Sequence, residues 1–249
     1  MKFTFCLVVV LLAVPALGVV TVSPIGDSLT SGVGSSEMGG YREHVKDVFG
    51  DRIDFLGRRA DGAFDDNQDE GWGGFTINTI RTNTITTIPK HSGFGQVVLL
   101  TAGTNEFAWV TDVANDNFQL RANQALADME SLLNETFNIA GDVTVLVSNI
   151  PAIRDWYHPT GYLFPGVDIY NAGLPDVIAR VAAHNHDVRF VDTASGLNLQ
   201  TDFWDGIHPN DSGYAKIGAA WSNALNSVVP EPTSAIALAP LLLLARRRR

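Results

Sequence analysis

Val19-Val20-Thr21-Val22-Ser23-Pro24-Ile25-Gly26-Asp27-Ser28-Leu29 is an apolar run that ends in Gly-Asp-Ser. Such a run is typical of a buried strand, and the residues after it predict a tight turn that presents Ser28 at the end of the strand. Far downstream, Asp205 and His208 place a carboxylate and an imidazole three residues apart. A serine becomes a good nucleophile only when a base takes its proton, so these three residues indicate a common site.

His208 is the candidate base for Ser28. Asp205 is placed to accept a hydrogen bond from the second imidazole nitrogen, which would fix the tautomer and stabilise the imidazolium. Pro209 restricts His208 to an extended backbone and so narrows its pose. Taken singly, each residue also suits an ordinary turn or a capped loop. Taken together, they predict a Ser28–His208–Asp205 triad.

Two blocks between these residues supply candidate oxyanion donors. Gly71-Trp72-Gly73-Gly74 is rich in glycine, which lets a backbone N–H approach a substrate closely. Asn105 follows another apolar run. The backbone N–H groups of Ser28 and Gly74 and the amide of Asn105 could donate three hydrogen bonds to a tetrahedral oxyanion. Alone, the glycine block also suits a surface loop, and Asn105 suits a turn.

Apolar runs alternate with amphipathic segments, which favours an α/β fold around a mostly parallel sheet. We expect five strands, at residues 19–25, 53–56, 96–101, 143–147 and 188–191. We expect helices at residues 41–49, 75–88 and 116–138, from Pro175 onwards, and after a cap at Asp211 or Ser212. The candidate site residues then follow strands, and the carboxyl ends of parallel strands are where open α/β sheets bind ligands.

The first residues predict a secretory signal peptide. Lys2 precedes an apolar run, and Ala16 and Gly18 give a small-x-small pattern of the kind that signal peptidase cleaves. The run is too short for a membrane span. We therefore expect residues 1–18 to be removed, together with Cys6, the only cysteine in the sequence.

The last residues, 230–249, carry a second address signal. Pro230-Glu231-Pro232 is followed by a short apolar segment and by Arg246 to Arg249. This combination resembles the PEP-CTERM sorting tail of Gram-negative bacteria. The resemblance implies transient membrane association, removal by an exosortase-like processing enzyme, and a location at the cell envelope.

Residues 19–229 have the length of one α/β domain with a sizeable core. The whole sequence has a formal net charge of −10. The terminal segments hold five of its 17 basic residues and one of its 27 acidic residues, so the remainder carries about −14. Such an acidic chain is a poor partner for nucleic acid or anionic lipid and is compatible with a neutral, esterified polymer.

His184 and His186 have no further metal-binding partner nearby, so we predict a helix-end turn there and no metal site.

The four blocks resemble those of the SGNH hydrolases of the GDSL type, a family named for a serine, a glycine, an asparagine and a histidine in separate blocks. The matching residues are Ser28 in Gly-Asp-Ser-Leu, Gly74 in Glu-Gly-Trp-Gly-Gly-Phe, Asn105 in Gly-Thr-Asn-Glu and His208 in Asp-Gly-Ile-His. The branch that the chain resembles most is carbohydrate esterase family three, the acetylxylan esterases. The segments that carry this likeness are Gly40-Tyr41-Arg42, Phe55-Leu56-Gly57, Phe75-Thr76-Ile77 and Asp205-Gly206-Ile207-His208-Pro209-Asn210.

The resemblance implies a three-layer α/β/α sandwich, flavodoxin-like, with no cofactor. It also implies a secreted esterase that removes O-acetyl groups from a polysaccharide through an acyl-enzyme on Ser28. The chain departs from the family pattern at Glu106, where aspartate is usual, and at Trp72, Gly73 and Phe75 around Gly74.

Trp72, Trp109 and Trp204 are candidates for lining a sugar cleft, because aromatic faces stack on sugar rings; buried tryptophan is equally ordinary core material. The small polar residues 30–40 favour an open site over a tunnel for a fatty acyl chain. Two other functions stay open at this point. One is a short-chain lipase or thioesterase of the same fold, and the other is a non-catalytic polysaccharide-binding surface protein that kept the fold.

Overall fold

The computed structural model describes residues 18–88, 93–110, 112, 115–154 and 164–231. Val19–Val229 forms one compact unit. The expected signal peptide and sorting tail lie outside the described residues, except for Gly18, Pro230 and Glu231 at their inner edges. In the part of the chain that is described, no helix is both long enough and apolar enough to cross a membrane.

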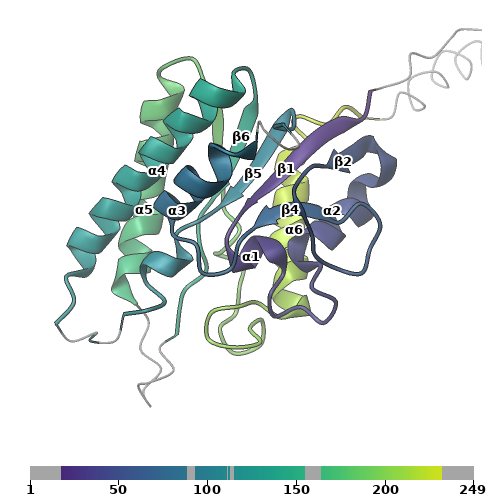
Figure 1. Cartoon of the computed structure of the whole chain (residues 1–249). Helices are drawn as coiled ribbons and strands as arrows, with labels where there is room; N and C mark the ends of the chain where they lie inside the picture. The colour runs from purple at the N-terminus through teal and green to yellow at the C-terminus, as the bar shows by residue number, and fades with distance from the viewer. Residues whose placement is uncertain (1–17, 89–92, 111, 113–114, 155–163, 232–249) are drawn as a thin grey trace, which may run out of the picture. The chain divides into compact units, whose positions relative to one another are not determined.

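A mostly parallel sheet forms the centre of this unit (Figure 1). Its strands are β1 (Val20–Gly26), β2 (Ile53–Phe55), β3 (Arg59–Ala60), β4 (Gln68–Gly71), β5 (Val97–Thr101), β6 (Thr144–Ser148) and β7 (Asp187–Val191). On one side, β1 pairs with β5, β5 with β6 and β6 with β7, all in parallel. On its other side, β1 pairs first with β2 and then, at Ile25 and Gly26, with β4. β3 adds a short antiparallel pairing to β4.

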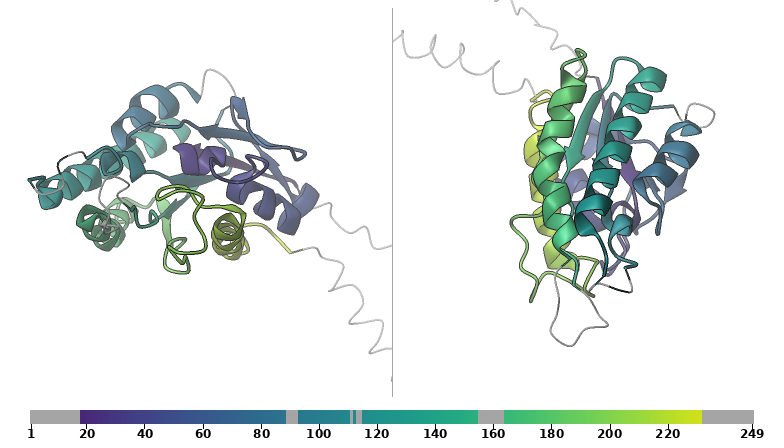
Figure 2. Two further views of the ribbon diagram at one scale, coloured as in Figure 1. Left: turned by 90° about the horizontal axis from the view of Figure 1, so that it is seen from below. Right: turned by 90° about the vertical axis from the view of Figure 1, so that its left-hand side faces the viewer.

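The helices are α1 (Ser28–Ser31), α2 (Gly40–Phe49), α3 (Ile77–Ile80), α4 (Phe118–Ala140), α5 (Pro165–Ala182) and α6 (Asp211–Leu225). Shorter turns are the 3₁₀ segments η1 (Gly50–Arg52) and η4 (Thr104–Glu106) and the one-turn π-helix η2 (Arg81–Ile85). Figures 1 and 2 show α3, α4 and α5 on one face of the sheet, with α2 and α6 on the other.

The sequence of β5 explains the two layers of helices. Side chains alternate between the faces of a strand, and every residue from Val97 to Leu100 is apolar and buried. Val98 and Leu100 pack into the core under α4 and α5, while Val97 and Leu99 pack into the core under α2 and α6. A strand that is apolar on both faces needs cover on both. The expected three-layer α/β/α fold is confirmed.

All five expected strands are present, and β3 and β4 extend the expected five-stranded sheet to seven strands. The sequence of β4, Gln68-Asp69-Glu70-Gly71, carries no apolar pattern that would predict a strand. It is buried because its carboxylates are paired. Asp69 lies 3.1 Å from the guanidinium of Arg42, and Glu70 lies 2.8 Å from that of Arg58. A buried charge costs much less free energy with such a partner than without one.

Two helix boundaries differ from expectation. α5 begins at Pro165, and Pro175 lies inside it, whereas the sequence suggested Pro175 as the first residue. Pro165 occupies the helix start, where a missing N–H costs nothing, while Pro175 is tolerated in the interior. The cap of α6 is Asn210, whose side-chain oxygen accepts from the N–H of Gly213 at 3.1 Å, and not Asp211 or Ser212. In addition, the single helix expected at residues 75–88 is divided into α3 and η2.

Candidate active site

The four sequence blocks meet at the carboxyl edge of the sheet (Figure 1). Ser28 opens α1 directly after β1, and Asn105 lies in η4 after β5. Gly74 follows β4, and the loop between β7 and α6 carries Asp205 and His208. Because β1, β4, β5 and β7 all run in the same direction, their following loops converge on one side of the sheet.

The turn into α1 is compact and fixes Ser28. A Cβ on Gly26 would lie 2.2 Å from the carbonyl oxygen of Thr101, so the close approach of β1 and β5 at this point requires glycine. Asp27 caps α1 by accepting the N–H of Leu29 at 2.9 Å. Ser28 itself is only 7% exposed, and its hydroxyl is therefore held in a narrow range of positions.

Asp27 carries an unfavourable buried charge. Burial raises the pKa of its carboxyl to about 6 from the ordinary value of 3.8. Its Oδ2 is buried and has no hydrogen-bond partner among the described residues. Because the folded pKa lies above the unfolded one, the ionised carboxylate costs stability; this cost is absent at acid pH and is fully present once the pH exceeds the folded pKa.

We therefore expect Asp27→Asn to stabilise the fold at about pH 8, by up to about 3 kcal/mol, and to have a much smaller effect at about pH 4. Asparagine keeps the oxygen that caps α1 and removes the charge. Urea unfolding of both proteins at the two pH values measures the difference. A difference in unfolding free energy that is the same at both pH values would contradict the assigned pKa.

Ser28, His208 and Asp205 form a continuous series of hydrogen bonds. The Oγ of Ser28 lies 2.9 Å from Nε2 of His208, and Nδ1 of His208 lies 2.7 Å from Oδ2 of Asp205. A carboxylate only accepts hydrogen bonds, so Nδ1 carries the imidazole proton and Nε2 is left to accept the serine hydroxyl. The arrangement can remove the proton from Ser28 as its oxygen attacks an electrophile.

The carboxylate of Asp205 is held in its charged form. Burial alone would raise its pKa, but hydrogen bonds from the His208 ring and from backbone N–H groups outweigh burial and lower the pKa. These backbone donors are the N–H groups of Ile207 and His208, at 2.7 and 2.5 Å from Oδ1. One oxygen therefore shapes the loop while the other orients the imidazole.

The loop that carries this pair is tied down at several points. The N–H of Trp204 donates to the carbonyl of His208 at 2.9 Å, and the N–H of Arg154 donates to the carbonyl of Gly206 at 2.8 Å. Asp202, which is buried, accepts from the ammonium of Lys216 at 2.6 Å. These contacts leave the backbone at His208 little freedom to move away from Ser28.

The candidate oxyanion donors lie beside Ser28. Gly74 has φ +81°, a backbone conformation that favours glycine, and a Cβ at this position would meet open space. Asn105 donates from Nδ2 to the carbonyl of Phe75 at 2.9 Å and accepts at Oδ1 from the indole N–H of Trp109 at 3.1 Å. Within the described part of the chain, the second N–H of this amide has no acceptor.

A cavity of about 240 Å³ joins these groups. It is lined by Ser28, Val33, Gly74, Asn105, Ala108, Trp109, Ile207 and His208. Apart from the candidate catalytic groups its walls are apolar, which suits a small acyl group next to the serine. Within the described residues, no group of three or more histidine, cysteine, aspartate or glutamate side chains could hold a metal ion.

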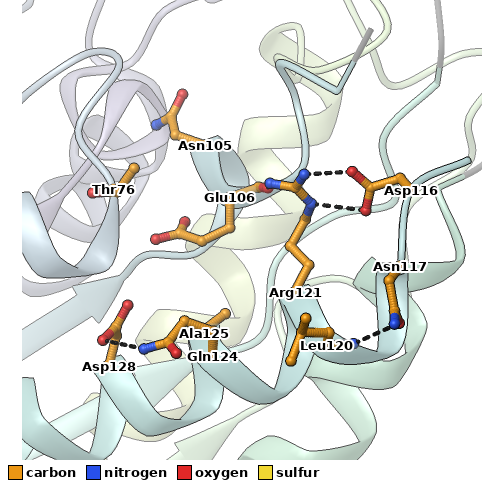
Figure 3. A pocket seen from close by; sticks show the side chains of 10 residues that line it. All are labelled: Thr76, Asn105, Glu106, Asp116, Asn117, Leu120, Arg121, Gln124, Ala125 and Asp128. Carbon is orange, nitrogen blue, oxygen red and sulfur yellow. Dashed lines mark hydrogen bonds and ion pairs between the residues drawn. The ribbon is translucent and has the colours of Figure 1, made fainter. Parts of the chain in front are cut away.

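Glu106 links the two oxyanion blocks. Its Oε1 accepts the N–H of Ile77 at 2.6 Å, at the start of α3, and burial raises its pKa to about 7. It also lines a larger cavity of about 560 Å³, shown in Figure 3, in which Arg121 is ion-paired with Asp116. Asn105 borders both cavities, and Figure 3 shows its amide pointing away from Arg121.

The three candidate tryptophans have different surroundings. Trp109 is 70% exposed and lines the cavity beside Ser28. Trp204 is 66% exposed and lines a neighbouring groove of about 490 Å³ that shares Val33 with that cavity. Trp72 does not line the cavity beside Ser28. Its ring packs against Phe75 and lies under the guanidinium groups of Arg58 and Arg59, 5.3 and 5.0 Å from its centroid.

Sequence reasoning missed the role of Arg42. This side chain is fully buried and donates to the carbonyls of Thr30, Asp61 and Asn67 at 2.6 to 2.9 Å, in addition to its pairing with Asp69. It fastens the segment after Ser28 to the loop before β4. Nothing in a single sequence distinguishes a buried arginine from an exposed one, so the segment Gly40-Tyr41-Arg42 indicates only a family likeness.

Several esterases are similar to this chain in sequence or in structure. A multidomain esterase of Ruminococcus flavefaciens is 27% identical over 236 residues, which are 83% of this chain and 28% of that protein. The chain therefore spans less than a third of this relative. A family 3 carbohydrate esterase of Clostridium thermocellum is 27% identical with a TM-score of 0.66, covering 86% of this chain and all of that one. A carbohydrate esterase family 3 structure from Talaromyces cellulolyticus, 20% identical, has the same fold with a TM-score of 0.63 over 84% of this chain and 98% of its own.

The family model described as "GDSL-like Lipase/Acylhydrolase family" matches residues 25–216. This range begins just before the Gly-Asp-Ser turn, ends inside α6 after His208, and so contains every block that the structure brings together around Ser28. The chain belongs to the GDSL-like lipase/acylhydrolase family.

Proposed function

We propose that this chain is a serine esterase that removes O-acetyl groups from a polysaccharide resembling acetylxylan. The observation that carries the proposal is the hydrogen-bonded series from Ser28 through His208 to Asp205, beside a cavity of about 240 Å³. In this proposal, Ser28 is the nucleophile, His208 the base and Asp205 the group that orients it.

The reaction follows from this geometry. The Oγ of Ser28 attacks the acetyl carbonyl carbon while Nε2 of His208 takes the hydroxyl proton. The resulting oxyanion accepts from the N–H groups of Ser28 and Gly74 and from the free N–H of Asn105. His208 then returns its proton to the departing sugar oxygen, which leaves acetyl-Ser28. Water attacks this ester with His208 again as base, and acetate and the free serine are released.

Three features support an acetylated carbohydrate over a lipid. The cavity is small, and the exposed rings of Trp109 and Trp204 border it and the adjoining groove, where sugar rings would pack. A solved family 3 carbohydrate esterase shares 27% of its sequence with this chain. The strongly acidic composition favours a neutral polymer over anionic lipid.

Release of acetate from acetylated xylan by the full chain tests the proposal. Hydrolysis of short acyl-thioesters or lipids without release of acetate from acetylated xylan would favour the lipase or thioesterase function instead.

Acyl-chain length gives a separate prediction. We expect kcat/KM on p-nitrophenyl esters to fall from acetyl to butyryl and to be very low for octanoyl. Each methylene adds about 0.8 kcal/mol of binding only when a pocket buries it, and this cavity must already hold the carbonyl group. The esters are compared below their micelle-forming concentrations. A preference for octanoyl over acetyl would overturn the carbohydrate assignment and leave the serine mechanism in place.

We also propose that residues 1–18 direct secretion and that residues 230–249 sort the protein to the cell envelope of a Gram-negative bacterium. The support is the sequence pattern at each end, including Arg246 to Arg249. Intact-mass analysis of the protein from its native envelope should find both segments missing. Recovery of native protein that still ends at Arg249 would argue against sorting and processing.

A further inference from the structure

Trp109 combines high exposure with an inward hydrogen bond. Its side chain is 70% exposed, which is unusual for so large an apolar group. Its indole N–H nevertheless donates to Oδ1 of Asn105 at 3.1 Å. Burial of the ring therefore does not explain the position of Trp109, whereas its contact with Asn105 gives that position a role at the active site.

The Asn105 amide is oriented by two partners of opposite kind. An indole N–H can only donate a hydrogen bond, and the carbonyl of Phe75, 2.9 Å from Nδ2, can only accept one. Rotation of the amide by half a turn would face N–H against N–H and oxygen against oxygen. Trp109 and Phe75 together therefore exclude the flipped amide. The second N–H of Nδ2 has no acceptor among the described residues, and Asn105 lines the same cavity as Ser28 and His208.

The backbone between the two residues makes this contact local and rigid. The N–H groups of Phe107 and Ala108 both donate to the carbonyl of Thr104, at 3.1 and 3.0 Å, which forms a tight turn. Phe107 is fully buried and packs against Tyr170. Phe107 thus anchors the turn in the core, and the turn places Trp109 next to Asn105.

We propose that Trp109 is a positioning residue for the oxyanion site: its indole N–H holds the Asn105 amide so that the free N–H points at the reacting carbonyl. This inference rests on the proposed role of Asn105 as an oxyanion donor. Without the indole N–H, only the Phe75 carbonyl opposes amide rotation, and a flipped amide would present an oxygen to the developing negative charge. The consequence is a loss in kcat with little change in KM, because the contact matters most in the transition state.

A double-mutant cycle with p-nitrophenyl acetate tests this inference. Trp109→Phe keeps an aromatic ring, although a smaller one, and removes the indole N–H. We expect Asn105→Ala to lower kcat by about 10²–10³-fold and Trp109→Phe to lower it by about five- to tenfold. In the Asn105→Ala background, Trp109→Phe should cause no further loss, because the group through which it acts is absent. The side-chain NH₂ signals of Asn105 in the NMR spectrum should also shift in Trp109→Phe while the melting temperature stays the same.

The outcomes separate this inference from the proposed function. A loss with Asn105→Ala but none with Trp109→Phe would overturn the positioning role and leave the oxyanion site in place. Equal losses from Trp109→Phe in both backgrounds would show that Trp109 acts independently of Asn105, which also overturns it. Full kcat in Asn105→Ala would remove the oxyanion role itself and this inference with it.

Discussion

Ser28→Ala is expected to abolish ester hydrolysis, with a fall in kcat of about 10⁴–10⁶-fold. The substitution removes the oxygen that lies 2.9 Å from Nε2 of His208 and leaves the Cβ in place. The fold should persist, because α1 is capped by Asp27 through the N–H of Leu29 and not by the serine hydroxyl. In the proposed function the role of Ser28 is chemical, so its loss should change the unfolding transition by only a small amount.

Rates of p-nitrophenyl acetate cleavage and of acetate release from acetylated xylan measure this effect. Ser131→Ala is a matched control, because that residue is exposed on α4 and its hydroxyl donates to the carbonyl of Ala127 within its own helix. We expect the control to keep full activity. Substantial hydrolysis by purified Ser28→Ala would mean that another group attacks the ester.

Asp205→Asn is expected to lower kcat by about 10⁴-fold while the loop keeps its shape. Asparagine can still use Oδ1 to accept the N–H groups of Ile207 and His208. Its amide N–H₂, however, would face Nδ1 of His208, where a carboxylate oxygen now lies at 2.7 Å. Nδ1 must then accept, so the proton moves to Nε2 and the imidazole can no longer take the proton of Ser28.

The ring nitrogens of His208 report this change of tautomer directly through their ¹⁵N chemical shifts, alongside kcat on p-nitrophenyl acetate. Asp142→Asn, in the exposed turn before β6, removes one surface charge and should leave both readouts unchanged. A rate for Asp205→Asn within tenfold of the wild-type rate would show that the tautomer of His208 does not depend on Asp205.

Apolar runs in the sequence predicted the strands that are buried by hydrophobic packing, such as β1 and β5. They did not predict β4, whose burial depends on ion pairs. β4 is polar, and its buried carboxylates pair with Arg42 in α2 and with Arg58 in the loop before β3. The predicted start of α5 at Pro175 is wrong, because proline favours the first turn of a helix and is only exceptionally tolerated in a helix interior, where Pro175 lies. Such outcomes are set by tertiary contacts, which a single sequence does not record.

The candidate site residues were easier to predict than the side chains that contact them. Ser28, Asn105 and His208 each follow a strand, and residues at the carboxyl ends of parallel strands converge whatever their separation in sequence. The contacts of the tryptophans could not be predicted in this way. Trp109 reaches Asn105 through a tight turn, whereas Trp72 is covered by Arg58 and Arg59, and both arrangements depend on side-chain directions that composition and spacing leave open.

The hydrogen bond between Ser28 and His208 joins residues that are 180 positions apart. β1 and α1 are synthesised before the loop that carries His208, which immediately precedes α6. In the proposed mechanism, a nascent or truncated chain that ends before this loop carries the nucleophile Ser28 without its base His208, and we expect it to cleave no ester. Under the proposed function, ester cleavage therefore requires the first and the last elements of the unit Val19–Val229 to fold together, which spectroscopic helix content does not report.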